Sequence, residues 1–259
     1  MQQPIVMILQ GGLGNQLFQY TAALQISQVL RRPVLLSPIQ LNKHSGKDYR
    51  ATLYKRLKST ESLDSPYVMV LDAYKPWDPV DFNVPYSVAL RGYFQYLPAI
   101  MPVLAVVCED LRGFLEPRRK LLAEKYYIRE PNNYGFIHVR RGDYVSATRA
   151  THWVQGVDYY MEALEHVKHI KTWFVVSDDA AWCRKQDCFV GFEVVDEPGE
   201  LDGLALMSLC NGAAIIGNST YSWWGAMIGA EKWRGTVVYP SKWYAEERPI
   251  MFPEEWQRV

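Results

Sequence analysis

The chain has 259 residues, of which 49% are hydrophobic and 22% charged, so it can bury a sizeable core and is not disordered throughout. Its length suits one large domain or two of about 125 residues. The 28 Lys and Arg residues balance 28 Asp and Glu residues, and this zero net charge argues against a general nucleic-acid binder. The balance hides an asymmetry, because residues 1–125 carry a net charge of +5 and residues 126–259 a net charge of −5.

Two features of the sequence bear on the compartment. No apolar run approaches the roughly 18 to 20 residues that span a membrane, and the N-terminal segment lacks the basic stretch of a signal peptide. The four cysteines show no metal-binding spacing and are too few for a disulfide scaffold, although Cys183 and Cys188 could lie close together. We therefore expect buried thiols and a cytoplasmic protein.

The N-terminal segment predicts the beginning of a parallel sheet. Residues 4–10 are typical of a buried strand, residues 11–15 of a glycine-rich loop, residues 16–31 of a helix and residues 33–37 of the next strand. This order is characteristic of parallel α/β folds. Residues 40–125 give a weaker pattern, because prolines interrupt them at positions 66, 76, 79, 85, 98 and 102. We expect short helices and loops around a small sheet there.

Strands alternate with helices in the second half. The expected strands cover residues 136–140, 172–177, 193–196, 213–217 and 236–239, and the expected helices cover 158–170, 202–211 and 220–230. This alternation predicts a doubly wound parallel sheet. We therefore expect an α/β protein with two Rossmann-like domains, at residues 1–128 and 129–259, that face each other across a cleft. Ligands of such sheets bind beyond the carboxyl ends of the strands.

The glycine-rich loop is the first candidate binding motif. Glycines after a first strand let backbone N–H groups approach an anion at the start of the following helix. A dinucleotide-binding fingerprint would require glycine at position 17 and an acidic residue at the end of the next strand, where this chain has Leu17 and Ser37. NAD and FAD are therefore not expected. The loop could also be only a tight turn, with Asn15 and Gln16 as helix caps.

His138, Arg140 and Asp143 form the second candidate. In a strand, His138 and Arg140 point to the same face, and Arg140 emerges at the carboxyl end of the sheet. The planar guanidinium of arginine donates two parallel hydrogen bonds to phosphate, so Arg140 suits a phosphorylated ligand. Asp143 could act as a base or hold an arginine. The alternative is an ion pair that only stabilises the loop.

Two further polar clusters follow expected strands. The carboxylates of Asp178 and Asp179 could bind a divalent metal, or one of them could cap the next helix. Ser219 and Thr220 begin an expected helix, where hydroxyl and backbone N–H groups form either an anion site or a plain N-cap. The tryptophans at 223–224 are expected in the core.

Five segments resemble, in the same order, the motifs of the bacterial α-1,2-fucosyltransferases. They are GGLGNQLFQY (11–20), RGYFQ (91–95), HVRRGDYV (138–145), FVVSDD (174–179) and LMSLCNGAAIIGNSTYSWWGA (206–226), and PSKWY (240–244) is similar to the closing segment of that family. The combination of HxRRGD with NSTxSWWGA is specific. The resemblance covers nearly the whole chain.

The resemblance implies a GT-B architecture, with the acceptor in the first Rossmann-like domain and the donor in the second. It implies inverting transfer of L-fucose from GDP-β-L-fucose to a galactoside, in α-1,2 linkage to the 2-hydroxyl of a terminal β-galactose, in O-antigen or capsule synthesis. It implies neither a metal nor another cofactor. The expected acceptor is a β-galactoside oligosaccharide or a lipid-linked glycan, so peripheral contact with the inner face of the membrane is also expected.

The resemblance also assigns residues to the site. It implies that Arg140 binds the donor diphosphate, that Asp202 contacts the guanine and that Asp179 lies in the donor site. The other expected donor-binding residues are Gly12, Gly14, Asn15, Asn218, Ser219 and Thr220. The expected catalytic residues are Arg140, Asp143 and His138.

An inverting transfer places negative charge on the β-phosphate of the leaving group. Arg140 and the helix N-terminus at Ser219 would stabilise this charge without a metal. Asp143 is the candidate base, although an oxocarbenium-like transition state could proceed without a strong one. Because the half that is expected to bind the donor has a net charge of −5, binding should depend on a few placed groups and only modestly on ionic strength.

Three alternatives are weighed against this function. The chain could transfer another GDP-sugar or form another fucosyl linkage. It could be a non-catalytic module that binds a sugar nucleotide or a glycan. A nicotinamide-dependent dehydrogenase is opposed by Leu17 and Ser37.

Overall fold

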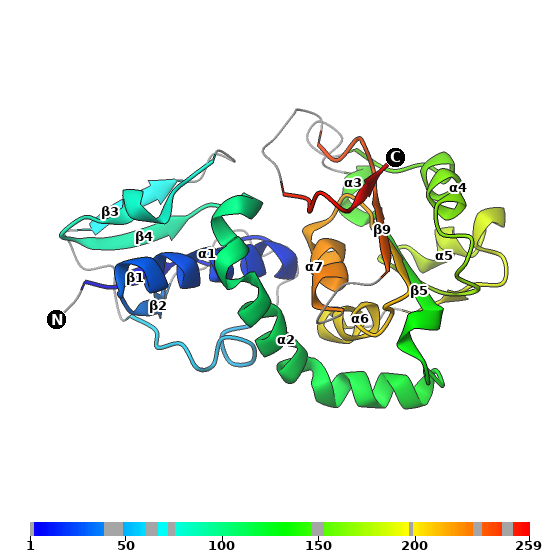
Figure 1. The fold of residues 1–259 in the computed structure, drawn as a ribbon, viewed down its shortest axis with the longest axis horizontal. Helices are drawn as coiled ribbons and strands as arrows, with labels where there is room; N and C mark the ends of the chain where they lie inside the picture. The colour runs from blue at the N-terminus through cyan, green and yellow to red at the C-terminus, as the bar shows by residue number, and fades with distance from the viewer. Residues whose placement is uncertain are drawn as a thin grey trace. The chain divides into compact units, whose positions relative to one another are not determined.

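The computed structural model describes residues 3–38, 49–60, 67–71, 76–146, 153–196, 199–229, 235–244 and 251–259. They contain two parallel β-sheets with accompanying helices, which confirms the expected α/β fold class (Figure 1). The chain divides into two compact units, residues 1–107 with 248–252 and residues 108–247 with 253–259. These units carry net charges of +5 and −5, as the predicted halves do. The division falls earlier in the chain than the predicted boundary at 128.

The first sheet has four parallel strands in the order β2-β1-β4-β3. They are β1 (Ile5–Met7), β2 (Val34–Leu36), β3 (Tyr67–Leu71) and β4 (Ser87–Arg91). The helix α1 (Leu13–Leu30) follows β1, and the 3₁₀ helix η1 (Pro79–Phe82) precedes β4. The helix begins before residue 16 because Gly12 takes the N-cap position, which places the end of the glycine-rich segment in its first turn.

The helix α2 (Leu97–Lys125) corrects the prediction of short helices between residues 40 and 125. It is a single helix of 29 residues, although Pro98 and Pro102 lie in it. Pro98 is its second residue, where no intrahelical N–H donor is required, and Pro102 removes only the bond to the carbonyl of residue 98. Buried apolar side chains recur every three or four residues along the helix, at Ile100, Val103, Leu104, Val107, Leu111 and Leu115. Burial of this stripe outweighs the cost of the prolines.

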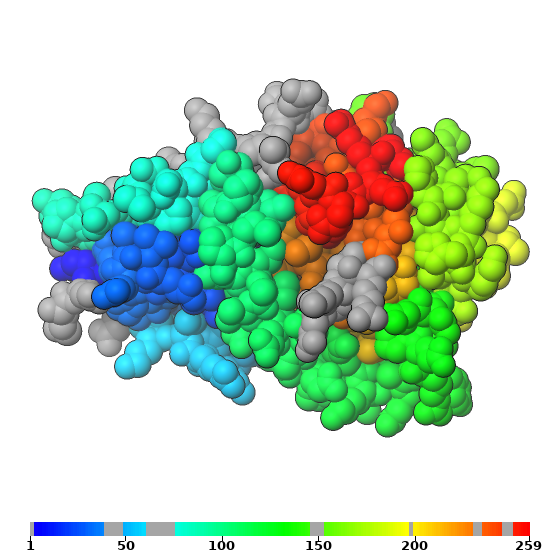
Figure 2. Space-filling view, viewed as in Figure 1, coloured from blue at the N-terminus to red at the C-terminus, as the bar shows by residue number. Residues whose placement is uncertain are grey.

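The second sheet has six parallel strands in the order β10-β9-β8-β5-β6-β7. They are β5 (Tyr134–Val139), β6 (Thr172–Ser177), β7 (Glu193–Val194), β8 (Ala213–Ile215), β9 (Thr236–Tyr239) and β10 (Gln257–Arg258). The five expected strands are confirmed, and β6 and β9 have the predicted bounds. The sequence pattern does not predict β10, whose two exposed residues lie in the C-terminal segment at the surface of the second unit (Figure 2).

Helices cover both faces of the second sheet. The helices α4 (Val157–Glu165) and α5 (Ala180–Cys183) lie on one side, and α6 (Glu200–Met207) and α7 (Thr220–Ile228) lie on the other (Figure 1). The shorter elements are η2 (Pro131–Asn133), α3 (Gly142–Ser146) and η3 (Asp187–Phe189). Trp223 and Trp224 of α7 are fully buried, which confirms their predicted place in the core. Pro66 and the last residue of the expected helix at 220–230 lie outside the described residues.

Each sheet contains a switch point, where the chain crosses to the other side of its first strand. The strands β2 and β4 flank β1 in the first sheet, and β6 and β8 flank β5 in the second. Ligands of open α/β sheets bind at such points. The glycine loop and the RGYFQ segment follow β1 and β4, whereas Arg140 and residues 217–220 follow β5 and β8. The fold therefore gathers the sequence motifs at its two switch points.

Candidate active site in the second unit

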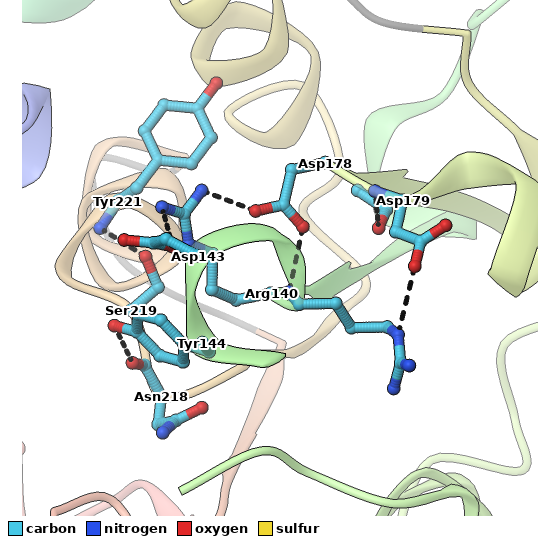
Figure 3. Close-up of polar contacts among 10 residues, drawn as sticks. Arg140, Asp143, Tyr144, Asp178, Asp179, Asn218, Ser219 and Tyr221 are labelled. Carbon is cyan, nitrogen blue, oxygen red and sulfur yellow. Dashed lines mark hydrogen bonds and ion pairs between the residues drawn. The ribbon is translucent and has the colours of Figure 1, made fainter. Parts of the chain in front are cut away.

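Arg140 is held between two carboxylates at the carboxyl end of β5. Its Nη2 donates to Oδ1 of Asp143 at 2.6 Å, and its Nη1 forms an ion pair with Oδ2 of Asp178, also at 2.6 Å. Figure 3 shows the guanidinium between these two side chains. A charge-assisted hydrogen bond of this length is strong, and together with the ion pair on the other side it restricts the orientation of the guanidinium plane. The arginine–aspartate ion pair that the sequence raised as one possibility for this loop is therefore confirmed.

Arg141 makes a second ion pair beside the first. Its Nε lies 3.2 Å from Oδ2 of Asp179, and its guanidinium lies 4.0 Å from the ring centroid of Trp182. The Oδ1 of Asp179 accepts a hydrogen bond from the N–H of Trp182 and caps α5. The alternative that one of these aspartates caps the next helix is thus confirmed. The place of Asp179 in a donor site stays a prediction.

Both ion pairs follow from the register of the parallel strands. Val139 ends β5 and lies opposite Ser177, which ends β6. The residues that follow each strand therefore leave the sheet side by side, two arginines from β5 and two aspartates from β6. The register therefore places the two arginines next to the two aspartates as soon as β5 and β6 pair.

Arg140, Arg141, Asp143, Asp178 and Asp179 form what we call the arginine–aspartate cluster. Two cations and three carboxylates give it a formal net charge of −1. Among the residues that the structure describes, no group of three or more His, Cys, Asp and Glu side chains is arranged to hold a metal ion. An anionic ligand would therefore be recognised by directed donors, because the cluster as a whole is not positive.

Asn218 holds two loops at the carboxyl end of β8. It is 2% exposed, and its Nδ2 donates to the carbonyl oxygens of Trp153 at 2.5 Å and Trp243 at 3.1 Å. The hydroxyl of Tyr144 donates to the carbonyl of Asn218, and the guanidinium of Arg140 lies 5.4 Å from the Tyr144 ring. The amide of Asn218 therefore fixes these loops, and its contact with the donor stays a prediction.

Ser219 caps α7. Its Oγ accepts from the N–H of Tyr221 at 3.3 Å, and the hydroxyl of Tyr221 donates to the carbonyl of Glu200 at the start of α6. The plain N-cap that the sequence allowed is confirmed. Ser219 and Thr220 are both half-buried, and their contact with a phosphate stays a prediction.

His138 is enclosed beneath this surface. It is 4% exposed, its ring lies edge-on to Tyr221 at 5.5 Å, and a Cβ at Gly217 would lie 2.9 Å from its carbonyl oxygen. Burial lowers the pKa of His138 to about 4, while nearby Asp178 raises it and Arg140 lowers it further. The imidazole is therefore neutral at pH 7. Its catalytic role stays a prediction, and its burial favours a packing role.

Asp202 lies in the first turn of α6 and pairs with α2. Its Oδ1 lies 3.1 Å from Nε of Arg118, and both side chains are partly exposed. Exposed ion pairs contribute little to stability. A guanine at this carboxylate, which stays a prediction, would compete with Arg118.

In the first unit, amide side chains hold the glycine loop. Gly11 has a φ of 73°, which glycine adopts without strain, and its carbonyl accepts from Nε2 of Gln16 at 3.0 Å. The Nε2 of Gln95 donates to Oδ1 of Asn15 at 2.9 Å, so the RGYFQ segment is bonded to the loop. The donor contacts of Gly12, Gly14 and Asn15 stay predictions.

Three contacts of these sites were beyond sequence reasoning. Tyr144 and Gln95 lie in the motifs HVRRGDYV and RGYFQ, and motif membership is the only signal that points to them. The sequence suggested Asp178 as a possible metal ligand or helix cap, whereas the structure pairs it with Arg140.

Comparison with known proteins places the chain in a family. The profile of Glycosyl transferase family 11 matches residues 91–259, which is more than half of the chain. The chain belongs to glycosyl transferase family 11. This confirms the resemblance to the bacterial α-1,2-fucosyltransferases that the motifs indicated.

Curated relatives of this family 11 chain include two Escherichia coli proteins. The O-antigen biosynthesis glycosyltransferase WbnK is 27% identical over 296 residues, with 92% of this chain and 94% of the relative covered. An alpha-1,2-colitosyltransferase is 25% identical over 302 residues, with 98% of each covered. The galactoside 2-alpha-L-fucosyltransferase SEC1 of Bos taurus is 34% identical over 121 residues, which cover 42% of this chain and 31% of that protein.

Solved structures of fucosyltransferases share the fold of this family 11 chain. Arabidopsis thaliana FUT1 in complex with GDP aligns with a TM-score of 0.53 at 13% identity, covering 92% of this chain and 70% of that one. The NodZ alpha-1,6-fucosyltransferase soaked with GDP-fucose aligns with a TM-score of 0.50 at 13% identity, covering 87% and 93%. These likenesses show the GT-B fold that the sequence predicted. The cleft between its domains stays a prediction.

No helix in the described part of the family 11 chain is both long and apolar enough to cross a membrane. The cytoplasmic location and the contact with a membrane surface stay predictions.

The lowered pKa of His138 predicts a pH-dependent stability of the second unit. Between about pH 6.5 and pH 4 the unfolded chain binds a proton that the folded chain excludes, so stability falls as the pH falls through this window. The expected loss is about 3 kcal/mol, and His138→Gln should remove most of it. Urea unfolding followed by tryptophan fluorescence would measure this, because eight of the nine tryptophans belong to the second unit. The exposed His169→Gln is the control, and equal pH dependence of wild type and His138→Gln would contradict the assignment.

Proposed function

We propose that this family 11 chain is an inverting transferase that moves L-fucose from GDP-β-L-fucose to the 2-hydroxyl of a terminal β-galactose. The proposal extends the family membership to a donor, an acceptor and a linkage. It is supported by the names of the relatives, which include a galactoside 2-alpha-L-fucosyltransferase and an O-antigen glycosyltransferase. We further propose that the product belongs to a surface glycan such as O-antigen or capsule.

The observation that carries the proposal is the placement of Arg140. Its guanidinium stands at the β5–β8 switch point, fixed by two carboxylates at 2.6 Å, and the N-terminus of α7 follows β8. A guanidinium has five N–H donors, of which the hydrogen bond to Asp143 uses one at Nη2, while Nη1 pairs with Asp178. The remaining donors suit a diphosphate, which offers several acceptor oxygens in a fixed arrangement.

The chemistry that this arrangement suits is departure of GDP. As the bond to the fucose anomeric carbon breaks, negative charge accumulates on the β-phosphate, and a positioned guanidinium lowers the barrier because it needs no reorganisation. Backbone N–H groups at the start of α7 would add to this stabilisation. We propose that these groups suffice without a metal, so that transfer needs no cofactor.

Asp143 is the proposed base for the acceptor hydroxyl. In the described state its Oδ1 accepts a hydrogen bond from Arg140. A diphosphate that recruits Arg140 would weaken this pair and leave the carboxylate able to accept a proton from the acceptor. Donor binding would in this way prepare the base.

Colitosyl transfer is the second candidate. The relative named alpha-1,2-colitosyltransferase aligns over 98% of this chain, a coverage similar to that of WbnK. Colitose is L-fucose without its 3-hydroxyl, so the two donors would place the same diphosphate against Arg140. Groups that contact the 3-hydroxyl would decide between them.

We propose that the acceptor is a β-galactoside oligosaccharide or a lipid-linked glycan and that transfer occurs in the cytoplasm. A lipid-linked acceptor would bring the protein to the inner face of the membrane. A module that binds sugar nucleotides without turnover is the alternative from another class, and release of GDP distinguishes the two.

The proposed function is tested by incubating the protein with GDP-fucose and a small panel of galactosides. We expect a fucosylated product whose linkage, determined by NMR, is α-1,2 to a terminal β-galactose, at equal rates in excess EDTA and in Mg²⁺. The colitose donor is run in parallel. A different linkage or faster colitosyl transfer would replace the proposal, and activity that EDTA abolishes and Mg²⁺ restores would refute metal independence.

Arg140→Ala should lower the rate of transfer by roughly 10²-fold or more, because it removes a preorganised group that stabilises charge in the transition state. The expected loss appears in kcat/KM measured with a saturating galactoside. Arg184→Ala, which removes a surface arginine paired with Asp196, is the control and should be neutral. Near-normal transfer by Arg140→Ala would remove the central support for the proposal.

Asp143→Asn should lower kcat while GDP binding is retained, because the amide cannot accept the proton but can still accept a hydrogen bond from Arg140. The expected decrease is about 10²-fold for loss of a general base. Steady-state kinetics and calorimetric titration with GDP measure the two properties separately. Loss of GDP binding would instead assign Asp143 to the structure of the loop.

A further inference from the structure

Asp178 uses both of its oxygens to fix the start of the β5–α3 loop. Its Oδ2 forms an ion pair with Nη1 of Arg140 at 2.6 Å, and its Oδ1 accepts a hydrogen bond from the backbone N–H of Arg141 at 2.8 Å. One carboxylate thus holds the guanidinium of Arg140 and the peptide unit that follows it (Figure 3). Any shift of Asp178 would change the position of the side chain and of the backbone together.

The support of Asp178 is more rigid than that of Asp143. Asp178 directly follows β6, whose register with β5 is set by hydrogen bonds along six residue pairs. Asp143 lies instead in the first turn of α3, a helix of five residues, three positions after Arg140. Asp178 therefore ties the guanidinium to the sheet, whereas Asp143 ties it to its own loop.

Gly142 makes room for this carboxylate. A Cβ at position 142 would lie 2.7 Å from Oδ2 of Asp178, closer than Cβ atoms approach other atoms, and 3.2 Å from its Cγ, so the carboxylate would have to shift. Gly142 is not among the described residues with positive φ, so its backbone conformation does not require glycine. The glycine in the HVRRGDYV motif is explained by the space that Asp178 occupies.

We propose that Asp178 is the positioning residue of Arg140 and that Gly142 is glycine so that Asp178 can take this position. The proposal rests on the proposed use of Arg140 for the donor diphosphate. Asp178 orients the guanidinium of Arg140, but its negative charge reduces the attraction of a phosphate. It is one of the three carboxylates of a cluster whose net charge is −1. Its removal should therefore impair the chemical step without weakening the attraction of GDP.

The experiment compares kcat and the Kd of GDP in two variants that disturb the same contact. Asp178→Asn keeps the size of the side chain and an oxygen that can accept from Arg141, and Gly142→Ala forces the carboxylate aside. Both should lower kcat by about 10- to 100-fold, the effect of a misplaced catalytic group, while GDP binds no more than about threefold more weakly than to wild type. Both matched controls should be neutral. They are Asp196→Asn, which breaks a surface ion pair, and Gly113→Ala, where a Cβ meets nothing within 4 Å.

A double-mutant cycle shows whether Asp178 acts through Arg140. In an Arg140→Ala background, Asp178→Asn should change kcat by less than about twofold, because no guanidinium is left to position. An equal loss in both backgrounds would assign Asp178 an independent role and overturn the proposal. Unchanged kcat in Asp178→Asn, or loss of the folded second unit in that variant, would also overturn it.

The outcomes separate this inference from the proposed function. If Arg140→Ala leaves both transfer and GDP binding unchanged, the proposed function fails first. If Arg140→Ala lowers transfer and Asp178→Asn does not, the proposed function stands and only the positioning role fails.

Discussion

The register between β5 and β6 is the constraint on which the second unit depends. Six parallel residue pairs end with Val139 opposite Ser177, and the ion pairs of Arg140 with Asp178 and of Arg141 with Asp179 extend the same alignment beyond the sheet. A shift by one residue would separate these partners and turn each side chain to the other face. The neighbouring residues Asp178 and Asp179 follow β6 directly. Asp179 caps α5, and Asp178 holds the guanidinium of Arg140 and the start of the β5–α3 loop.

The arginine–aspartate cluster is suited to recognise an anion by the orientation of its donors and not by its overall charge. Its net charge is −1, and it lies in a unit whose sequence carries −5. Carboxylates reduce the attraction of a phosphate, yet they hold a side chain with several rotatable bonds in one arrangement before a ligand arrives. Such preorganisation favours the transition state more than ground-state binding. This balance suits a transferase that must release GDP after each turnover.

The sequence predicted the strands of the second unit well, but it did not predict which side chains from different strands would contact one another. Strong alternation of apolar strands and helices located β6 and β9 without error, because buried parallel strands are short apolar runs with clear ends. The pairing of Arg140 with Asp178 was not predictable, because the spacing along the chain does not reveal which strands pair or in which register. The helix α2 was missed because local rules weigh Pro98 and Pro102 against a helix, whereas the burial of its apolar stripe is a property of the folded chain.

The two switch points differ in chemistry although they share a topology. At the switch point of the first unit the side-chain contacts are made by amides, with Gln16 bonded to Gly11 and Gln95 to Asn15. At the switch point of the second unit they are made by charged groups, with Arg140 paired to two aspartates. The side chains of Gln16 and Gln95 are buried, and they hold the loop without adding net charge. Guanidinium groups held by carboxylates match the oxygens of a phosphate. The expected division between an acceptor-binding first unit and a donor-binding second unit agrees with this contrast between amides in one site and charges in the other.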